Sequence, residues 1–440
     1  MNFHTDTQTL EEMNLLGKFR QGSIYNLFNQ VQTRGGEQLL DTMFQNPLTN
    51  ADAINERSRV LQFFQQRALT FPFDVPEIGA MREYLDTGTG NNALSTMAAT
   101  IIKKILAGVT RDERYKKMVQ GLQATIGTLN KCWLFLQQLQ ALTGDWGVRV
   151  KAIQELLADK RLEQLRNIDI YKALPVNTLA YYDHVLKHGL HDNMERLLAF
   201  IYELDVYIAV SHVARASRFT YARAYPPEQN SLQATGLYHP ALKGAIGNTI
   251  SMHADSNVLF LTGANMAGKS TWMKSVGIAV YLAHMGFPVA AASMEFSVRD
   301  GLYSSINVAD NINLGYSHFY AEVVRVKQAA VAVSTGKRLL VLFDELFKGT
   351  NVKDAYDGTL AVTEALAGYR SCLFIVSTHI IEVGEVLKQL PNIHCAYMPT
   401  VMEGAHPRYT YQLQEGITED RQGMMIIQNE GILELITPPD

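Results

Sequence analysis

The stretch TGANMAGKST, residues 262–271, places a glycine-rich turn directly before a lysine and two hydroxyl side chains. It fits a phosphate-binding pattern whose obligatory positions here are Gly263, Gly268, Lys269 and Ser270. In that pattern main-chain N–H groups cradle phosphate oxygens, the lysine reaches the β and γ phosphates, and the hydroxyl binds magnesium. The stretch therefore predicts a triphosphate site; the plainer alternative is a glycine turn that binds nothing.

A pair of carboxylates could complete such a site. The run RLLVLFDE is apolar until it ends in Asp344 and Glu345. A phosphate loop needs a second strand with a carboxylate for the magnesium shell. Asp344 would hold the metal through water, and Glu345 would orient or deprotonate the attacking water. The alternative is an acidic pair that only caps the following helix.

A third candidate is His379, which follows the apolar run CLFIVST. Ligands of parallel sheets bind at the carboxyl ends of the strands, so His379 would lie beside the other two motifs and sense the γ-phosphate. A lone histidine after a strand is more often structural. This prediction therefore depends on the two preceding motifs.

The loop can act only between a strand and a helix whose N-terminus faces the anion. Residues Val258 to Thr262 read as that strand, and Ser270 to His284 read as that helix. Two further runs, Leu339 to Phe343 and Leu373 to Val376, are short and apolar throughout. Such strands need cover on both faces, which predicts a mostly parallel sheet between helices.

Nearer the C-terminus, the segments CAYMPTVMEG and RYTYQLQEG alternate polar and apolar residues around a turn-rich GAHP. This pattern predicts antiparallel strands at the edge of the sheet.

The first half of the chain is helical in pattern from about Leu10 to Arg223. Apolar residues recur at steps of three and four along one predicted helix, at Met118, Leu122, Ile126, Leu129, Trp133 and Leu136. The segment AYPPEQN then breaks the periodicity with two prolines. We therefore expect an all-α domain over residues 1–225 and an α/β domain over residues 226–440.

Bulk properties agree with an ordinary globular protein of 440 residues, 47% of them hydrophobic and 19% charged. The net charge of −4 gives no overall basic signature, so contact with nucleic acid would need a local patch. Three cysteines without metal-site spacing favour a reduced cytoplasm. We expect neither a secretion signal nor a membrane-spanning segment.

Taken together, these motifs resemble the ATPase domain of the MutS family of DNA mismatch-repair proteins. The same order is found in TGANMAGKST, LFDELFKGTN, the STH at 377–379, and LYSSINVADNINLGYSHFYAE. The upstream YHPAL and AIGNTISM also match, and RGGEQLLDTMFQNPLTNADAINERSRVLQFF resembles the family's helical core, with one helix ending before Asn46 and the next starting near Thr49 or Asn50.

The resemblance implies an ABC-type P-loop NTPase domain over residues 226–440 that binds ATP and Mg²⁺, preceded by an all-α core/lever domain over residues 1–225. It implies composite sites in a homodimer, where Ser317 would reach the γ-phosphate on the opposite protomer. It also implies that Ile246 and Asn248 contact adenine. The remaining residues it assigns to nucleotide binding are Ala264, Asn265, Met266, Ala267 and Thr271, two of which depart from the family, since Ala264 replaces its usual proline and Ala267 a glycine.

The resemblance further implies ATP-driven binding of mismatched or branched double-stranded DNA. The family's N-terminal mismatch-reading domain is not apparent, since the sole Phe-x-Glu triplet is Phe343 to Glu345. The best basic cluster for phosphate contacts is Lys103, Lys104, Arg111, Arg114, Lys116 and Lys117. Such a cluster is more often a solvated helix face.

Two other classes stay open. A transporter-type ATPase would need an LSGGQ run, and GYSHF stands in that place. A scaffold that binds ATP without hydrolysis is disfavoured by the intact Asp344 and Glu345. Neither class would recognise DNA specifically.

Overall fold

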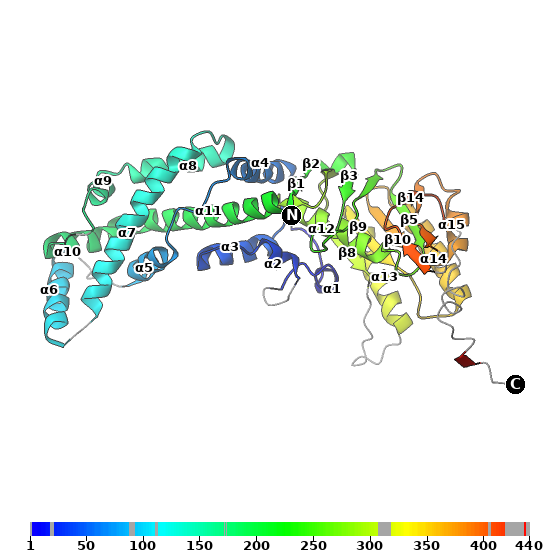
Figure 1. The fold of residues 1–440 in the computed structure, drawn as a ribbon, viewed down its shortest axis with the longest axis horizontal. Coiled ribbons are helices and arrows are strands. Elements are labelled where there is room, and N and C mark those ends of the chain that lie inside the picture. The colour runs from blue at the N-terminus through cyan, green and yellow to red at the C-terminus, as the bar shows by residue number, and fades with distance from the viewer. Residues whose placement is uncertain are drawn as a thin grey trace. The chain divides into compact units, whose positions relative to one another are not determined.

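The computed structural model describes residues 2–17, 22–87, 93–110, 113–170, 172, 174–306, 318–403, 406–418 and 435–436, and Figure 1 shows its ribbon. The chain divides into two compact units. Unit 1 comprises Met1–Phe28, Met43–Arg59 and Val213–Asp440, and unit 2 comprises Asn29–Thr42 and Val60–His212. Three helices contribute residues to both units, namely α3 (Arg34–Gln45), α4 (Ala51–Arg67) and α11 (His191–Ser217).

The regular elements of unit 2 are all helices among its described residues. Besides its parts of α3, α4 and α11, it contains α5 (Val75–Asp86), α6 (Ala93–Thr110), α7 (Arg114–Leu136), η1 (Gln137–Leu139), α8 (Gly144–Leu157), α9 (Lys160–Arg166), α10 (Val176–His184) and the π-helix η2 (Val185–Gly189). Met118, Leu122 and Ile126 are buried along α7, as their spacing predicts. Gly121 lets α7 approach α5 closely, since a Cβ there would lie 2.4 Å from Cβ of Tyr84.

Helix α11 is long and apolar enough to cross a membrane by length and composition, with a mean hydropathy of 1.5 over its most apolar window. That window is 78% buried, as in the core helix of a globular protein. One buried polar residue, Asp205, has a local role. It accepts hydrogen bonds from the main-chain N–H groups of Gln32 and Thr33 at 3.0 and 2.7 Å, and so fixes the chain just before α3.

Unit 1 is built on a six-stranded mixed sheet in the order β14-β11-β5-β10-β9-β8. Five strands are parallel neighbours, and β14 is antiparallel at one edge. Their bounds are β5 (Val258–Gly263), β8 (Gly301–Ser305), β9 (Leu339–Asp344), β10 (Leu373–Ser377), β11 (Ile393–Met398) and β14 (Gln414–Glu415). The helical and mixed-sheet content predicted from the sequence is therefore present.

Helices cover both faces of this sheet, as the continuous apolar strands predict. Residues of α13 (His318–Ser334), α14 (Val352–Ala367) and α15 (Ile381–Leu387) share one core cluster with Val258, Phe343 and Val376. On the other face, α12 (Lys269–His284) packs against β5, β9 and β10. The central strands β5, β9 and β10 are apolar until their carboxyl ends, where Thr262, Asp344 and Ser377 lie.

The smaller elements of unit 1 complete the fold. A four-stranded sheet has the order β2-β7-β3-β4, and β1 pairs with β6. Their bounds are β1 (Thr220–Tyr221), β2 (Arg223–Tyr225), η3 (Pro227–Gln229), β3 (Leu232–Leu237), β4 (Asn248–Met252), β6 (Pro288–Val289) and β7 (Ser293–Ser297), and the N-terminal helices are α1 (Thr7–Glu12) and α2 (Ile24–Phe28).

The prediction for the C-terminal strands is wrong in one respect. The alternating segment CAYM belongs to β11, which lies inside the sheet and pairs in parallel with β5 from Ile393 to Met398. The antiparallel pairing is instead between β12 (Thr400–Glu403) and β13 (His406–Tyr409), which form a separate hairpin, and between β11 and β14. The alternating pattern of β11 resembles that of an edge strand because only the short β14 pairs with β11 on its outer side.

The division into units differs from the expected boundary at residue 225. Residues before α3 and around Asn50 group with unit 1 because they bond to the residue before β8 and to the end of α12. His4 N–H donates to the Asp300 carbonyl at 2.7 Å, and Leu48 N–H donates to the His284 carbonyl at 2.8 Å. The predicted break between helices is confirmed, since α3 ends at Gln45 and Asn50 Oδ1 caps α4 at Ala53 N–H.

Candidate functional site

The glycine-rich loop connects β5 to the N-terminus of α12, the context that its sequence predicts. Gly263 and Gly268 have φ angles of 140° and 101°, and Met266 also lies in the left-handed region at 69°. Side chains are disfavoured there, which explains the glycines. The loop therefore turns back over the first turn of α12 with its main chain close to any bound group.

Lys269 lies folded beneath this loop. It is 4% exposed, and its ammonium donates hydrogen bonds to the carbonyls of Gly263 at 2.8 Å and Ala264 at 3.1 Å. Burial lowers its pKa, while the charges of Glu345 and Asp344 act in the opposite direction. An ammonium held by main-chain carbonyls near two carboxylates is available to pair with an anion in the loop.

The acidic pair lies at the same edge of the sheet as the loop. Ser377 is the register partner of both Asp344 on β9 and Leu261 on β5, so β10 separates the two motifs by one strand. The Ser377 hydroxyl donates to the Asp344 carboxylate, and the Ser377 carbonyl accepts from Glu345 N–H at 2.9 Å. Glu345 has a φ of 54°, a sparsely populated conformation for a glutamate. Its backbone turns sharply where the strand ends.

Two charged residues that the sequence analysis did not select lie beside this pair. A small cavity is lined by Ser305, Ile306, Glu322, Asp344, Glu345, Leu346 and Lys348. Glu322 comes from α13 and is 4% exposed. It lies within the quoted HFYAE segment, but only the tertiary fold brings it to β9. Among the described residues, no group of three or more His, Cys, Asp or Glu is arranged to hold a metal alone.

His379 follows β10 at the carboxyl edge, and its side chain is exposed. Thr378 N–H donates to the Leu261 carbonyl at 3.1 Å, which fixes the chain next to β5 just before His379. The structure therefore brings together the glycine loop, the acidic pair and His379. Ser317 lies outside the described residues.

A pocket of about 530 Å³ opens beside the first turns of α12. It is lined by Tyr238, His239, Leu242, Lys243, Gly244, Ala245, Ile246, Asn248, Gly268, Thr271, Trp272, Ser275, Met398, Tyr409 and Tyr411. The lining is mostly apolar and aromatic, with few polar groups, as is usual for a site that receives a planar ring. Ile246 and Thr271, both expected at a nucleotide site, lie on it.

Asn248 lines the pocket but uses its amide on the protein itself. Its Nδ2 donates to the Tyr411 carbonyl at 2.9 Å, and its Oδ1 accepts from Leu413 N–H at 2.7 Å. These bonds hold residues 411–413 against the start of β4. Asn248 thus fixes the wall of the pocket that contains Tyr411.

The aromatic wall was missed from the sequence. Tyr409 and Tyr411 have ring centroids 6.2 Å apart, and a Cβ on Gly268 would lie 2.9 Å from Cδ1 of Tyr411. The segment RYTYQ was interpreted only as strand. Nothing in its alternation indicates that the chain returns across the pocket to the glycine loop.

Two models of protein families match the chain, one in each half. Residues 8–211 match the family model "MutS domain III", and residues 259–437 match "MutS domain V". The chain belongs to the MutS family. The domain V match contains the glycine loop, the acidic pair and His379, and the domain III match covers most of unit 2.

Three curated MutS relatives give the extent of the likeness. "DNA mismatch repair protein MutS" of Wolbachia pipientis wMel is 32% identical over 186 residues, which is 42% of this chain and 21% of the relative. The protein of the same name from Shouchella clausii (strain KSM-K16) is 26% identical over 56% of this chain and 28% of its own. "DNA mismatch repair protein spellchecker 1" of Drosophila melanogaster is 27% identical over 51% and 25%. The aligned part of the chain thus spans about a quarter of each relative's length.

Proposed function

We propose that this chain is an ATPase of the ABC-type P-loop class, and that it couples ATP binding and hydrolysis to the binding of mismatched or otherwise distorted duplex DNA. One observation carries the proposal. A glycine loop with a buried lysine, a carboxylate pair and an aromatic pocket lie around one edge of one sheet. The curated relatives, whose names state DNA mismatch repair, supply the DNA part.

The triphosphate would lie over the loop, with its base in the 530 Å³ pocket. Main-chain N–H groups at the start of α12 would bind the phosphates, supported by the helix dipole. The Lys269 ammonium would exchange its two carbonyl acceptors for β- and γ-phosphate oxygens. Asn265, Met266 and Ala267 would contribute main chain rather than side chain, since the Met266 side chain is 77% exposed.

The donor set fits magnesium. Mg²⁺ keeps several waters and is usually held by one or two protein groups together with substrate phosphates. Ser270, in the first turn of α12, and Asp344, across β10, are such groups. The Ser377 hydroxyl would keep the Asp344 carboxylate oriented toward the metal. The ion would neutralise charge that develops on the phosphates.

Glu345 would orient or deprotonate the attacking water, and His379 would contact the γ-phosphate from the next strand. Ser317 would reach the γ-phosphate of a second protomer, which makes the active unit a homodimer with composite sites. ATP would favour the closed dimer because both protomers would then contact the triphosphate, and this difference in affinity would drive the movement of the helical unit on DNA. We place this activity in the cytoplasm.

The hydrolytic assignment is tested with Glu345→Gln. We expect the rate of ATP hydrolysis to fall about 10²–10⁴-fold, the usual contribution of a general base, while ATP binding persists. Glu364→Gln on the exposed face of α14 is the matched control. Unchanged turnover in Glu345→Gln would remove Glu345 from the mechanism. Binding of ATP without any turnover in the unsubstituted protein would indicate an ATP-binding scaffold.

The DNA part has its own experiment. Affinity for homoduplex, mismatched duplex and four-way DNA is compared at one salt concentration, with and without ATP. We expect tighter binding to at least one distorted DNA and a change in that preference with ATP. Phosphate contacts alone depend on salt and do not distinguish DNA structures. Equal affinity for all three substrates would contradict specific recognition.

A further inference from the structure

The turn that follows β9 has an unusual backbone. Glu345 and Phe347 have φ angles of 54° and 61°, in the left-handed region that residues with side chains seldom adopt. Such a conformation costs free energy and persists only where the surrounding structure imposes it. Glu345 is also the residue that we propose as the base of ATP hydrolysis. The contacts that hold this turn therefore set the position of that carboxylate.

Helices α13 and α14 both contact this turn. On α14, the Thr359 hydroxyl donates to the Leu346 carbonyl at 3.3 Å. On α13, the ring of Phe319 lies edge-on to the ring of Phe347, with the two centroids 6.1 Å apart. The position of α13 therefore matters for the turn, because a displaced helix would leave the strained backbone at Phe347 without this support.

A second contact of α13 reaches the same segment. Glu322, one turn along the helix from Phe319, is 4% exposed and lines the small cavity beside Asp344 and Glu345. Its carboxylate accepts a long hydrogen bond of 3.5 Å from Gly349 N–H. Residues three apart lie on the same side of a helix, so Phe319 and Glu322 form one contact surface for the chain that follows β9.

Arg325 follows one turn after Glu322 and ties α13 to two other elements. Its side chain is 5% exposed, and its Nε donates to the Ser304 carbonyl near the end of β8 at 2.9 Å. Its Nη2 donates to the Thr9 hydroxyl at 2.9 Å and to one carboxylate oxygen of Asp6 at 3.0 Å. Its Nη1 donates to the other oxygen of Asp6. One guanidinium thus joins α13, β8 and the N-terminal helix α1.

The N-terminal helix is itself fixed at this point. Thr9 is fully buried, and its hydroxyl also accepts from Ser304 N–H at 3.0 Å. The Asp6 carboxylate caps α1 by accepting from Thr9 N–H at 2.8 Å. Burial acts to raise the pKa of Asp6, but the hydrogen bonds from Arg325 and Thr9 outweigh it, and the pKa is lowered. Asp6 therefore stays ionised at neutral pH and paired with Arg325.

We propose that Arg325 is a positioning residue for ATP hydrolysis. Anchored by Asp6 and Thr9, it holds α13 in the place where the turn from Glu345 to Phe347 keeps its strained conformation. This inference rests on the proposed ATPase function. The glycine loop lies between β5 and α12, and Arg325 does not line the pocket beside α12. Loss of Arg325 should therefore lower the rate of hydrolysis and leave ATP affinity unchanged.

The test measures kcat for ATP hydrolysis and, separately, the affinity for a non-hydrolysable ATP analogue, both on the full chain. Arg325→Met removes every hydrogen bond of the guanidinium, and Arg325→Lys keeps a cation beside Asp6. The matched control is Asn55→Ala, which removes two hydrogen bonds to the Ala224 main chain, of 2.8 and 2.9 Å, elsewhere in unit 1. Circular dichroism and urea denaturation establish that each variant is folded and how far it is destabilised.

We expect kcat to fall about tenfold to 100-fold in Arg325→Met, because a small misplacement of a catalytic group costs rates of this size. Arg325→Lys should retain more of the rate, and Asn55→Ala nearly all of it. Affinity for the analogue should change less than about twofold in all three variants. Unchanged kcat in Arg325→Met, equal losses in Arg325→Met and Asn55→Ala, or a matching loss of affinity would overturn the proposal.

Amide hydrogen exchange over residues 344–350 gives a readout that needs no turnover. Exchange there should become faster in Arg325→Met and in the milder Asp6→Asn, and stay unchanged in Asn55→Ala, because only the first two release α13. If the unsubstituted protein does not hydrolyse ATP, the proposed function fails, and exchange still decides whether Arg325 holds the turn. Unchanged exchange in Arg325→Met would overturn the inference whatever the turnover.

Discussion

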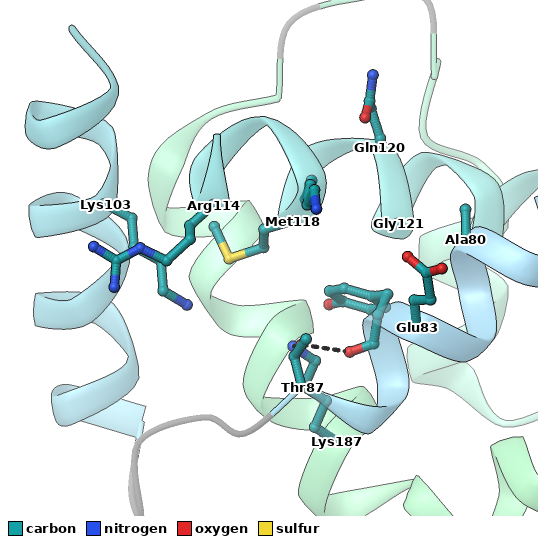
Figure 2. A pocket seen from close by; sticks show the side chains of 11 residues that line it. Ala80, Glu83, Thr87, Lys103, Arg114, Met118, Gln120, Gly121 and Lys187 are labelled. Carbon is teal, nitrogen blue, oxygen red and sulfur yellow. Dashed lines mark hydrogen bonds between the residues drawn. The ribbon is translucent and has the colours of Figure 1, made fainter. Parts of the chain in front are cut away.

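Lys269 and Lys187 are both buried lysines, but they are held in different ways. Lys269 donates to two main-chain carbonyls of its own loop. Lys187 is paired with the carboxylate of Asp183, donates to Thr87 (Figure 2) and lies against the ring of Tyr84. Burial lowers the pKa of both ammonium groups.

This difference indicates different roles, with Lys269 available to bind a ligand and Lys187 already paired within the fold. The carbonyl contacts of Lys269 leave its charge without a full counter-charge in direct contact, so a phosphate can take their place. Lys187 already has a counter-ion whose side chain is only 2% exposed. Removing one partner of such a pair leaves an uncompensated buried charge. We therefore expect Lys269 to matter for binding and Lys187 for stability.

The largest expected effect is on folding. Lys187→Met should lower the free energy of unfolding by about 3–5 kcal/mol, because Asp183 would stay buried without its partner. The double variant Lys187→Met/Asp183→Leu should recover most of that loss, since both charges are then absent. Urea denaturation followed by far-ultraviolet circular dichroism measures each value.

This prediction would fail in a recognisable way. If the losses in Lys187→Met and Asp183→Leu simply added in the double variant, the pair would not act as a unit. Lys187 would then contact its neighbours without being coupled to Asp183, and the contrast with Lys269 would disappear.

The next effect is on nucleotide affinity. Lys269→Ala should weaken ATP binding about 100-fold or more, because charge-assisted bonds to two phosphates are lost. The free energy of unfolding should stay the same or rise, since a partly compensated buried charge has been removed. Calorimetry and denaturation are run together, with Lys274→Ala one turn along α12 as the control. Normal ATP affinity in Lys269→Ala would contradict the proposal that Lys269 and the glycine loop bind the triphosphate.

The sequence predicted the part of this site that is local in the chain. A strand, a glycine turn and a helix are contiguous, so the pattern of residues 262–271 indicates both the loop and its direction. Asp344 and His379 were placed correctly at the strand ends because parallel strands present their carboxyl ends at one edge.

The remaining parts depend on contacts between distant segments. Tyr411 lies more than 140 positions after Gly268, and its place in the pocket wall is set by the hydrogen bonds of Asn248 to the returning chain. Glu322 reaches the acidic pair through the packing of α13. In unit 2, the basic cluster was visible in the sequence, but the burial of its described residues was not; Arg111 of that cluster lies outside the described residues. That burial depends on how α5, α6 and α7 pack.

The smallest expected effect concerns the aromatic wall of the pocket, and it distinguishes the contribution of Tyr411 to ATP binding from that of Lys269. Tyr411→Ala should weaken ATP binding by about threefold to tenfold, the usual worth of one aromatic contact. Binding of inorganic tripolyphosphate should not change, because this probe has no base to occupy the pocket, whereas Lys269→Ala should weaken both. Tyr369→Ala, with a tyrosine 42% exposed outside the pocket, is the control. Equal losses for ATP and tripolyphosphate in Tyr411→Ala would mean that the ring supports the glycine loop through Gly268 and does not bind the base.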